Sequence, residues 1–72
     1  MKVDNMQLPQ FLRYIHDAVP IMIFNVKDTC ICSVRDKQSI DIDLYEYVIL
    51  DIGIGDSDIK GCKSAIYITL EK

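Results

Sequence analysis

The stretch VILDIGI at residues 48–54 decides the fold class of this chain. Its apolar side chains recur at every second position, at Val48, Leu50, Ile52 and Ile54. A period of two is that of a half-buried β-strand, because successive side chains of a strand point to opposite faces of the sheet. Residues 66–70 repeat the pattern. We therefore predict two paired strands, joined by the connection at residues 55–63, which is rich in Gly, Asp and Ser.

Two more strands are predicted nearer the N-terminus, at residues 20–26 and 30–35. Both runs are rich in β-branched residues, and the polar residues 27–29 separate them, which is the spacing of an antiparallel hairpin. Residues 36–47 are open to two interpretations, since the alternation within them fits a strand and also a single helical turn. We expect a loop with a short turn of helix there.

An amphipathic helix is predicted before the first strand. The apolar residues follow the i, i+3, i+4, i+7 spacing of one helix face, and they are Leu8, Phe11, Leu12 and Ile15. Pro9 suits the first helical turn, and Pro20 disfavours helical geometry at Val19. We therefore place the helix at about residues 8–18.

These elements predict an α+β fold in the order α-β-β-β-β, as a single domain over residues 1–72. A chain of 72 residues buries only roughly 60% of the surface that its unfolded form exposes, which leaves no room for a second core. We expect a four-stranded antiparallel sheet with the N-terminal helix packed across one face, as a two-layer sandwich.

The opposite face of that sheet is expected to keep apolar side chains. The first strand is apolar on both sides, so one alternate pair of its residues would lie there together with Ile49. That pair is either Ile21 with Ile23 or Met22 with Phe24. An uncovered apolar sheet face favours self-association, and we predict a homo-oligomer, most simply a homodimer.

The charged residues are unevenly distributed. The net charge is −3, and residues 41–58 contain six acidic residues and no Lys or Arg. Non-specific nucleic-acid binding depends on Lys and Arg that neutralise phosphates, and the eight such residues here are scattered along the chain. The distribution argues against direct binding of nucleic acid and favours a protein with a basic surface as the partner.

The N-terminus shows no apolar region followed by a cleavage site, so we expect no signal peptide. The longest uncharged apolar run, at residues 18–24, is far shorter than the ~18–20 residues that span a membrane. We expect a cytoplasmic protein that does not insert into membranes and whose thiols are reduced.

Metal binding is one interpretation of four side chains, those of Cys30, Cys32, Cys62 and His16, which are of the types that hold zinc. Two cysteines separated by one residue on a strand lack the geometry of a zinc knuckle, and cysteine is often a buried apolar residue. Residues 56–61 imitate a calcium loop, but a lysine stands where the fifth position needs an oxygen ligand. We therefore interpret the cysteines as structural thiols and expect neither metal nor cofactor.

Gly53 and Gly55 form a G-x-G pair without a third glycine or a following helix, which excludes a nucleotide-binding motif. Glycine inside a strand marks a bulge or a close approach of another chain, and we interpret the pair as a place where a partner packs on the sheet. Catalysis is not predicted, because the only histidine, His16, falls on the solvent face of the helix and no pair of carboxylates has a motif that would shift its pKa. We predict that the protein is not an enzyme.

The acidic segment carries aromatic residues that suit an interface. Tyrosine is enriched at interface hot spots, and Tyr45 and Tyr47 would stand on one side of the segment if it is extended. The alternative is that these tyrosines lie at the rim of the protein's own core. The predicted partner-binding residues are Asp41, Asp43, Tyr45, Glu46, Tyr47, Asp56 and Asp58.

The layout of the chain also resembles a known group of proteins. A helix and a V-x-I-like strand are followed by a strand that ends in VRD at residues 34–36, by LYEYVILDI at residues 44–52 and by IYITL at residues 66–70. Over residues 8–71 this order is similar to that of small uncharacterised α+β proteins carried by prophages and mobile elements of Gram-positive bacteria. The resemblance implies an inhibitor of host machinery, including host defence proteins, and it assigns no functional residue.

The first hypothesis for function is therefore a non-enzymatic protein-binding module or inhibitor that uses the acidic and aromatic segment against a basic host protein. A homo-oligomeric protein that binds or sequesters a small ligand between its subunits is the alternative, because one subunit of this size is too small to enclose a pocket. A small metal-thiolate protein is a third interpretation, and it depends on the three cysteines.

Overall fold

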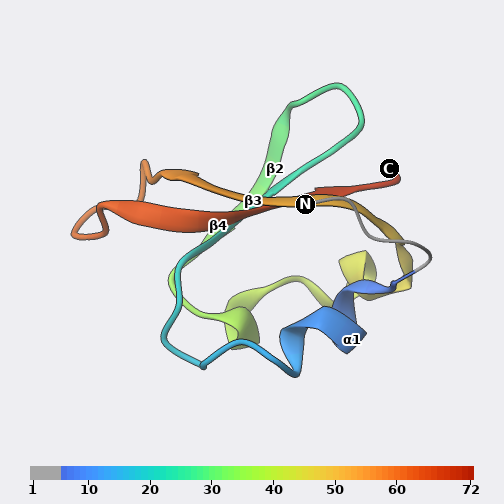
Figure 1. The fold of residues 1–72 in the computed structure, drawn as a ribbon, viewed down its shortest axis with the longest axis horizontal. Helices are drawn as coiled ribbons and strands as arrows, with labels where there is room; N and C mark the ends of the chain where they lie inside the picture. Colours follow the sequence, from blue (N-terminus) through green and yellow to red (C-terminus); the bar gives the residue numbers. More distant parts are fainter. Residues whose placement is uncertain (1–5) are drawn as a thin grey trace.

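The computed structural model describes residues 6–72, so the expectation about a signal peptide, which rests on the first residues, lies outside the described part. A four-stranded sheet has one α-helix and two 3-10 helices on the same side of it (Figure 1). In chain order the elements are α1 (Leu8–Leu12), β1 (Ile21–Phe24), β2 (Cys30–Val34), η1 (Lys37–Ser39), η2 (Ile42–Glu46), β3 (Ile49–Asp56) and β4 (Ser64–Leu70).

The α+β class and the α-β-β-β-β order are confirmed, but the prediction of an antiparallel sheet is wrong. The strand order is β2-β1-β4-β3, and β1 and β4 pair in parallel, so the sheet is mixed. Two antiparallel hairpins, β1–β2 and β3–β4, meet along their most apolar strands, which can be buried on both faces. The connection at residues 35–48 makes this possible, because its two 3-10 helices carry the chain beneath the sheet to the far edge (Figure 1).

The helix α1 is shorter than predicted, ending at Leu12 instead of near residue 18. A lysine side chain satisfies backbone carbonyl groups where the helix was expected to continue. The Nζ of Lys37 in η1 donates hydrogen bonds of 2.7 Å to the carbonyl oxygens of Leu12 and Ile15. The Leu12 carbonyl also accepts from the Ile15 N–H at 3.3 Å, in the turn that follows the helix. The predicted apolar face is nevertheless confirmed, because Leu8, Leu12 and Ile15 are buried. No helix among residues 6–72 has the length and apolar character needed to cross a membrane.

The core lies between the helices and one face of the sheet, here called the core face. Its largest fully buried side chains are those of Leu8, Ile21, Ile23, Ile49, Ile68 and Leu70. The prediction that Ile49 lies on the opposite face is wrong. A register shift between Ile49 and Asp51 sets two residues of β3 against one of β4, which turns Ile49 inward and leaves Leu50 exposed.

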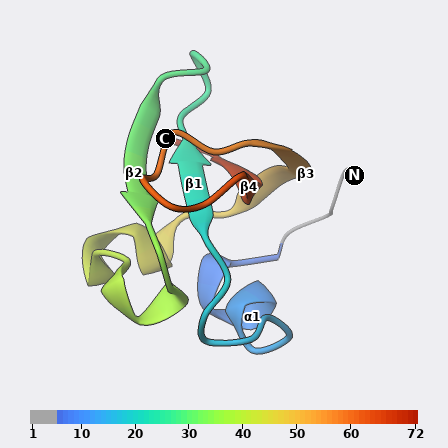
Figure 2. The same ribbon diagram turned by 90° about the vertical axis from the view of Figure 1, so that its left-hand side faces the viewer.

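The other face of the sheet, here called the back face, carries Met22 and Phe24 of β1 opposite Tyr67 and Thr69 of β4. Met22 is buried there although no helix covers it. The β3–β4 loop crosses this face to reach β2, where Arg35 Nη2 donates to the Lys60 carbonyl at 2.6 Å (Figure 2). Part of the back face is therefore covered by the chain itself, and the remainder forms the candidate site.

Candidate binding site

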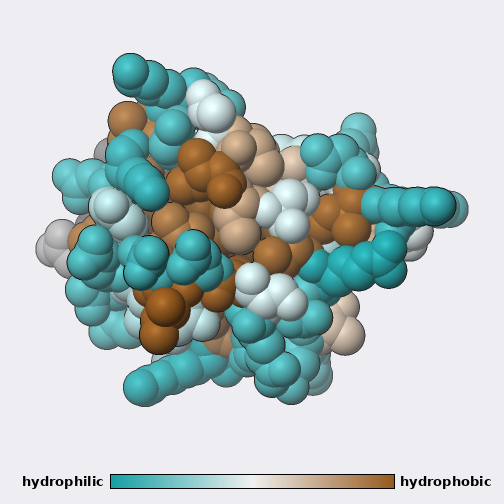
Figure 3. All heavy atoms as spheres, turned by 180° about the vertical axis from the view of Figure 1, so that it is seen from behind, coloured by the Kyte–Doolittle hydropathy of each residue, from teal (hydrophilic) through white to brown (hydrophobic). Residues whose placement is uncertain are grey.

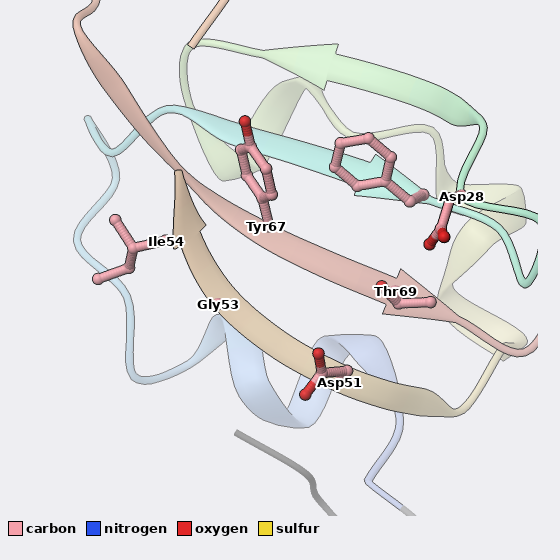
Figure 4. Close-up of a pocket in the computed structure, with 7 residues that line it drawn as sticks. Asp28, Asp51, Gly53, Ile54, Tyr67 and Thr69 are labelled. Carbon is pink, nitrogen blue, oxygen red and sulfur yellow. The ribbon is translucent and has the colours of Figure 1, made fainter. Parts of the chain in front are cut away.

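A hollow of about 350 Å³ lies on the uncovered part of the back face, between the end of β1 and the middle of β3 (Figure 4). Strands β1, β3 and β4 and the β1–β2 turn all contribute to it. Its lining residues are Phe24, Asp28, Asp51, Gly53, Ile54, Tyr67 and Thr69. Figure 4 shows Asp28 and Asp51 on either side of Thr69, with Tyr67 standing up from β4. A hollow of this size accepts a side chain or a small organic group.

The two glycines of β3 create the space for this hollow. A Cβ atom added at Gly53 would meet nothing within 4 Å, so the missing side chain leaves an open gap in the back face. A Cβ at Gly55 would lie 2.5 Å from Cζ of Tyr67, so the tyrosine ring rests directly on this glycine. The Tyr67 hydroxyl then reaches across β3 and donates a hydrogen bond to the Asp56 carbonyl. The G-x-G pair therefore opens the hollow and positions its tyrosine.

Two aromatic rings form one wall of the hollow. The ring centroids of Phe24 and Tyr67 are 5.0 Å apart, with their planes tilted by 50°. This separation and tilt are typical of favourable aromatic pairs, in which the edge of one ring approaches the face of the other. Ring faces carry partial negative charge, so such a wall attracts cations as well as apolar groups.

Two carboxylates stand at the rim. Asp28 lies in the β1–β2 turn with a φ of 61°, a left-handed conformation that Asp tolerates better than most residues. The Asn25 side chain holds this turn, since its Oδ1 accepts from the backbone N–H groups of Lys27 and Thr29. Asp51 projects from β3, and it takes part in a further interaction within the chain.

No Lys, Arg or His is among the residues of the described chain that line this hollow. Carboxylates beside aromatic faces attract ammonium and guanidinium groups through charge and through the ring quadrupole. The arrangement is therefore suited to a cationic group supplied from outside the hollow.

The residues predicted to bind a partner are divided between two ends of the molecule. Asp41, Asp43, Tyr45, Glu46 and Tyr47 lie in or beside η2, under the sheet. Asp56 and Asp58 lie at the tip of the β3–β4 hairpin, which extends away from η2 (Figure 1). The acidic segment is thus not one surface, because the chain folds into a 3-10 helix before entering β3.

The tyrosines beside η2 are engaged with the protein itself. Tyr45 and Tyr47 are half-buried against the core cluster, and Lys72 Nζ lies 5.3 Å from the centre of the Tyr47 ring. Some of the carboxylates have internal roles too. The Asp41 side chain accepts from the Asp43 N–H at 3.0 Å, which caps η2, and Asp58 accepts from Ser33 Oγ at 3.3 Å.

The cysteines and the histidine are more exposed than buried structural residues would be. Cys30 and His16 are exposed, and Cys32 and Cys62 are half-buried free thiols. Burial raises the pKa of the Cys32 thiol above its usual value, and the neighbouring Cys30 acts in the same direction. Among residues 6–72, no group of three or more His, Cys, Asp or Glu side chains is placed to hold a metal ion.

None of the lining residues is among the predicted partner-binding residues, and of them only Gly53 was interpreted from the sequence as lying where a partner packs. In the sequence, Phe24 and Thr69 are typical residues of the predicted strands, and Asp28 is a polar residue of the predicted turn. The signal that points to the hollow is the pair of glycines in an otherwise β-branched strand. Comparison of the chain with protein-family models, with curated proteins and with solved structures found no match.

Proposed function

We propose that this protein is a non-enzymatic binding module that receives a cationic side chain of a basic partner protein in the back-face hollow. The observation that supports the proposal is the joint presence of the Asp28 carboxylate and an aromatic wall around an open gap at Gly53. A Lys or Arg of the partner would gain charge pairing and ring contact in one place. Arginine suits the site best, because its planar guanidinium both stacks on rings and pairs with carboxylates.

The resemblance to accessory proteins of prophages and mobile elements adds a biological role to this proposal. An inhibitor of a host protein works by occupying a functional surface, and surfaces that bind nucleic acid are basic. An acidic, aromatic hollow on a chain of net charge −3 is complementary to such a surface. We therefore propose that the protein uses this hollow to inhibit a basic host protein.

A pair of substitutions tests the proposal against the surface beside η2. Asp28→Asn removes a charge at the hollow and keeps a residue that tolerates the left-handed backbone, and Asp43→Asn removes an equivalent exposed charge at η2. The probe is a short fluorescein-labelled peptide rich in arginine, measured by fluorescence anisotropy at several salt concentrations. We expect Asp28→Asn to weaken binding about three- to tenfold and Asp43→Asn to leave it unchanged. The reverse result would assign binding to η2.

Self-association is a second proposal, and it concerns apolar residues outside the hollow. Val26, Ile42 and Leu50 are exposed, and Ile42 is 73% exposed. The face behind the view of Figure 1 also carries hydrophobic side chains in its centre, with hydrophilic residues around them (Figure 3). Light scattering tests this proposal directly. A mass of 8.3 kDa that does not change up to high micromolar concentration would show that these residues do not join two copies.

A further inference from the structure

Among the strands that the structure describes, β3 lies at an edge of the sheet, and hollows lie on both of its faces near Gly53 and Ile54. On the back face is the acidic, aromatic hollow. On the core face, beyond the end of the helical layer, is an apolar groove of about 460 Å³. It is lined by Phe11, Ile52, Gly53, Ile54 and Ile66. The two hollows share Gly53 and Ile54, so they meet across the edge of the strand.

The hydrogen-bond pattern of the β3–β4 hairpin shows which backbone groups face outward at this edge. Ser57 N donates to the Lys63 carbonyl at 3.1 Å, which makes these two residues a hydrogen-bonded pair. Such pairs alternate along an antiparallel ladder, so Gly55 and Gly53 also bond to β4. The N–H and C=O of Ile54 therefore point away from β4, towards the edge of the described sheet.

The first part of β3, before Gly53, is engaged by interactions within the chain. At the start of β3, Ile49 N donates to the Met6 carbonyl at 2.7 Å, and Asp51 and Ile52 take part in further interactions. Proteins usually protect exposed edges with lysine, proline or a bulge, because an open edge pairs with other chains. At Ile54 none of these devices is present, and the side chain is 81% exposed.

We propose that an extended segment of the partner adds to β3 as a further strand at Ile54, which rests on the cation binding proposed above. Side chains of a strand alternate between faces, so a partner residue opposite Ile54 would enter the core-face groove. The residue next to it in the partner, opposite Gly53, would enter the back-face hollow. The partner segment recognised here therefore alternates an apolar residue with Arg or Lys.

The charge of β3 disfavours a second copy of the same strand as the occupant. The strand contains Asp51 and Asp56 and no cationic residue. A paired copy would bring further carboxylates towards the rim at Asp28, and like charges close together are destabilising. A partner strand with alternating cations is complementary to the same rim.

Backbone methylation of a peptide probe tests this mode of binding. The probe is a short labelled peptide of alternating valine and arginine, measured by fluorescence anisotropy with the full chain. One form is N-methylated at every valine, whose N–H groups would face Ile54, and the matched control is N-methylated at every arginine, whose N–H groups would face away. We expect valine methylation to lower the affinity on the order of tenfold, and arginine methylation to change it less than about threefold.

The outcomes separate this inference from the proposal on which it rests. Equal losses for the two methylated peptides, while Asp28→Asn still weakens the unmodified peptide, would overturn strand addition and leave cation binding intact. Failure of Asp28→Asn to affect any peptide would overturn cation binding, and strand addition with a cation in the hollow would be overturned with it. A peptide of the same composition with its valines and arginines in separate blocks should bind more weakly, and equal binding would also contradict the inference.

Discussion

Two regions of this molecule combine aromatic rings with carboxylates, and they use them differently. Beside η2, Tyr45 and Tyr47 pack against the protein's own core, and lysines of the same chain are already close. Lys72 Nζ lies 5.3 Å from the centre of the Tyr47 ring, and Lys37 lines a shallow hollow together with Tyr45. The Tyr47 ring therefore already has a cation of the same chain beside it.

The back-face hollow has the same chemistry without a lysine or arginine among its described lining residues. Phe24 and Tyr67 form the aromatic wall, Asp28 and Asp51 stand at the rim, and Gly53 leaves the gap. An acidic, aromatic composition therefore does not by itself define a binding surface. What distinguishes the two regions is that Lys72 lies over the Tyr47 ring, whereas no Lys or Arg is among the described residues that line the hollow.

The largest effect expected from this comparison is a loss of stability at Tyr47. Tyr47→Ala should lower the free energy of unfolding by about 2–3 kcal/mol, because the ring packs on the buried core. The matched control is Tyr14→Ala, which removes a ring that is 82% exposed and should change stability by less than about 0.5 kcal/mol. Urea denaturation measures both. If Tyr47→Ala instead weakens peptide binding without destabilising the fold, the η2 region is the interface.

The next effect concerns Lys37, the lysine of the η2 region that holds the end of α1. Lys37→Met keeps most of the aliphatic side chain and removes a charged donor to the Leu12 and Ile15 carbonyls. We expect a loss of about 2 kcal/mol in the free energy of unfolding, since hydrogen bonds from charged groups are worth about 1.5–3 kcal/mol. Lys27→Met, in the exposed β1–β2 turn, is the control and should be nearly silent in the same thermal melts. Equal melting temperatures for the two variants would show that Lys37 does not cap the helix.

Substitutions at the two glycines of β3 test how the hollow is built. Neither glycine has a positive φ, so alanine is compatible with both backbones. Gly55→Ala should cost about 1–3 kcal/mol, because its Cβ would collide with the Tyr67 ring. Gly53→Ala should be neutral or stabilise by up to about 0.5–1 kcal/mol, because glycine weakens a strand and the added Cβ meets nothing.

A larger residue at Gly53 separates folding from binding. Gly53→Val should preserve the melting temperature, since valine favours strands, and should lower the affinity for the arginine peptide about tenfold or more by filling the hollow. Thermal denaturation and fluorescence anisotropy on the same sample check both results. Unchanged affinity in a stable Gly53→Val protein would move the binding site away from the back face.

Local elements of the fold followed from the sequence, and their arrangement did not. The apolar spacing of Leu8 and Leu12 identified the buried face of α1, although Ile15 is buried beyond the end of the helix. The polar residues 27–29 identified the β1–β2 turn. The parallel pairing of β1 with β4 was missed, because no local pattern records where residues 35–48 deliver the chain. The end of α1 was missed for a similar reason, since Lys37 that caps it comes from a distant part of the sequence.

The candidate site was predictable only in outline. Gly53 and Gly55 in a β-branched strand were interpreted as a place where a partner packs, and in the structure it is the Tyr67 side chain of the same chain that rests on Gly55. The contribution of Asp28 depends on the pairing of β1 with β4, which brings the β1–β2 turn beside Thr69. The acidic segment was expected to act as one surface, but η2 and the hairpin tip take its residues to different ends of the molecule.

The smallest expected change in the free energy of unfolding is at Asp28, at the rim of the hollow. Its φ of 61° is a conformation that glycine adopts without steric cost and that other L-residues adopt at some cost. Asp28→Gly should therefore raise the free energy of unfolding by about 0.5 kcal/mol, a value below the usual left-handed penalty because Asp tolerates this region.

The same substitution should lower the affinity for the arginine peptide about three- to tenfold, because a rim carboxylate is lost. Asp28→Asn separates the two effects, since it removes the charge and keeps the side chain in the left-handed region. Both variants should therefore bind equally weakly, and only Asp28→Gly should be more stable. A gain of stability with full binding would mean that the aspartate serves only the turn. Loss of binding with a gain of stability would mean that a less favourable turn residue occupies this position because its charge is needed at the hollow.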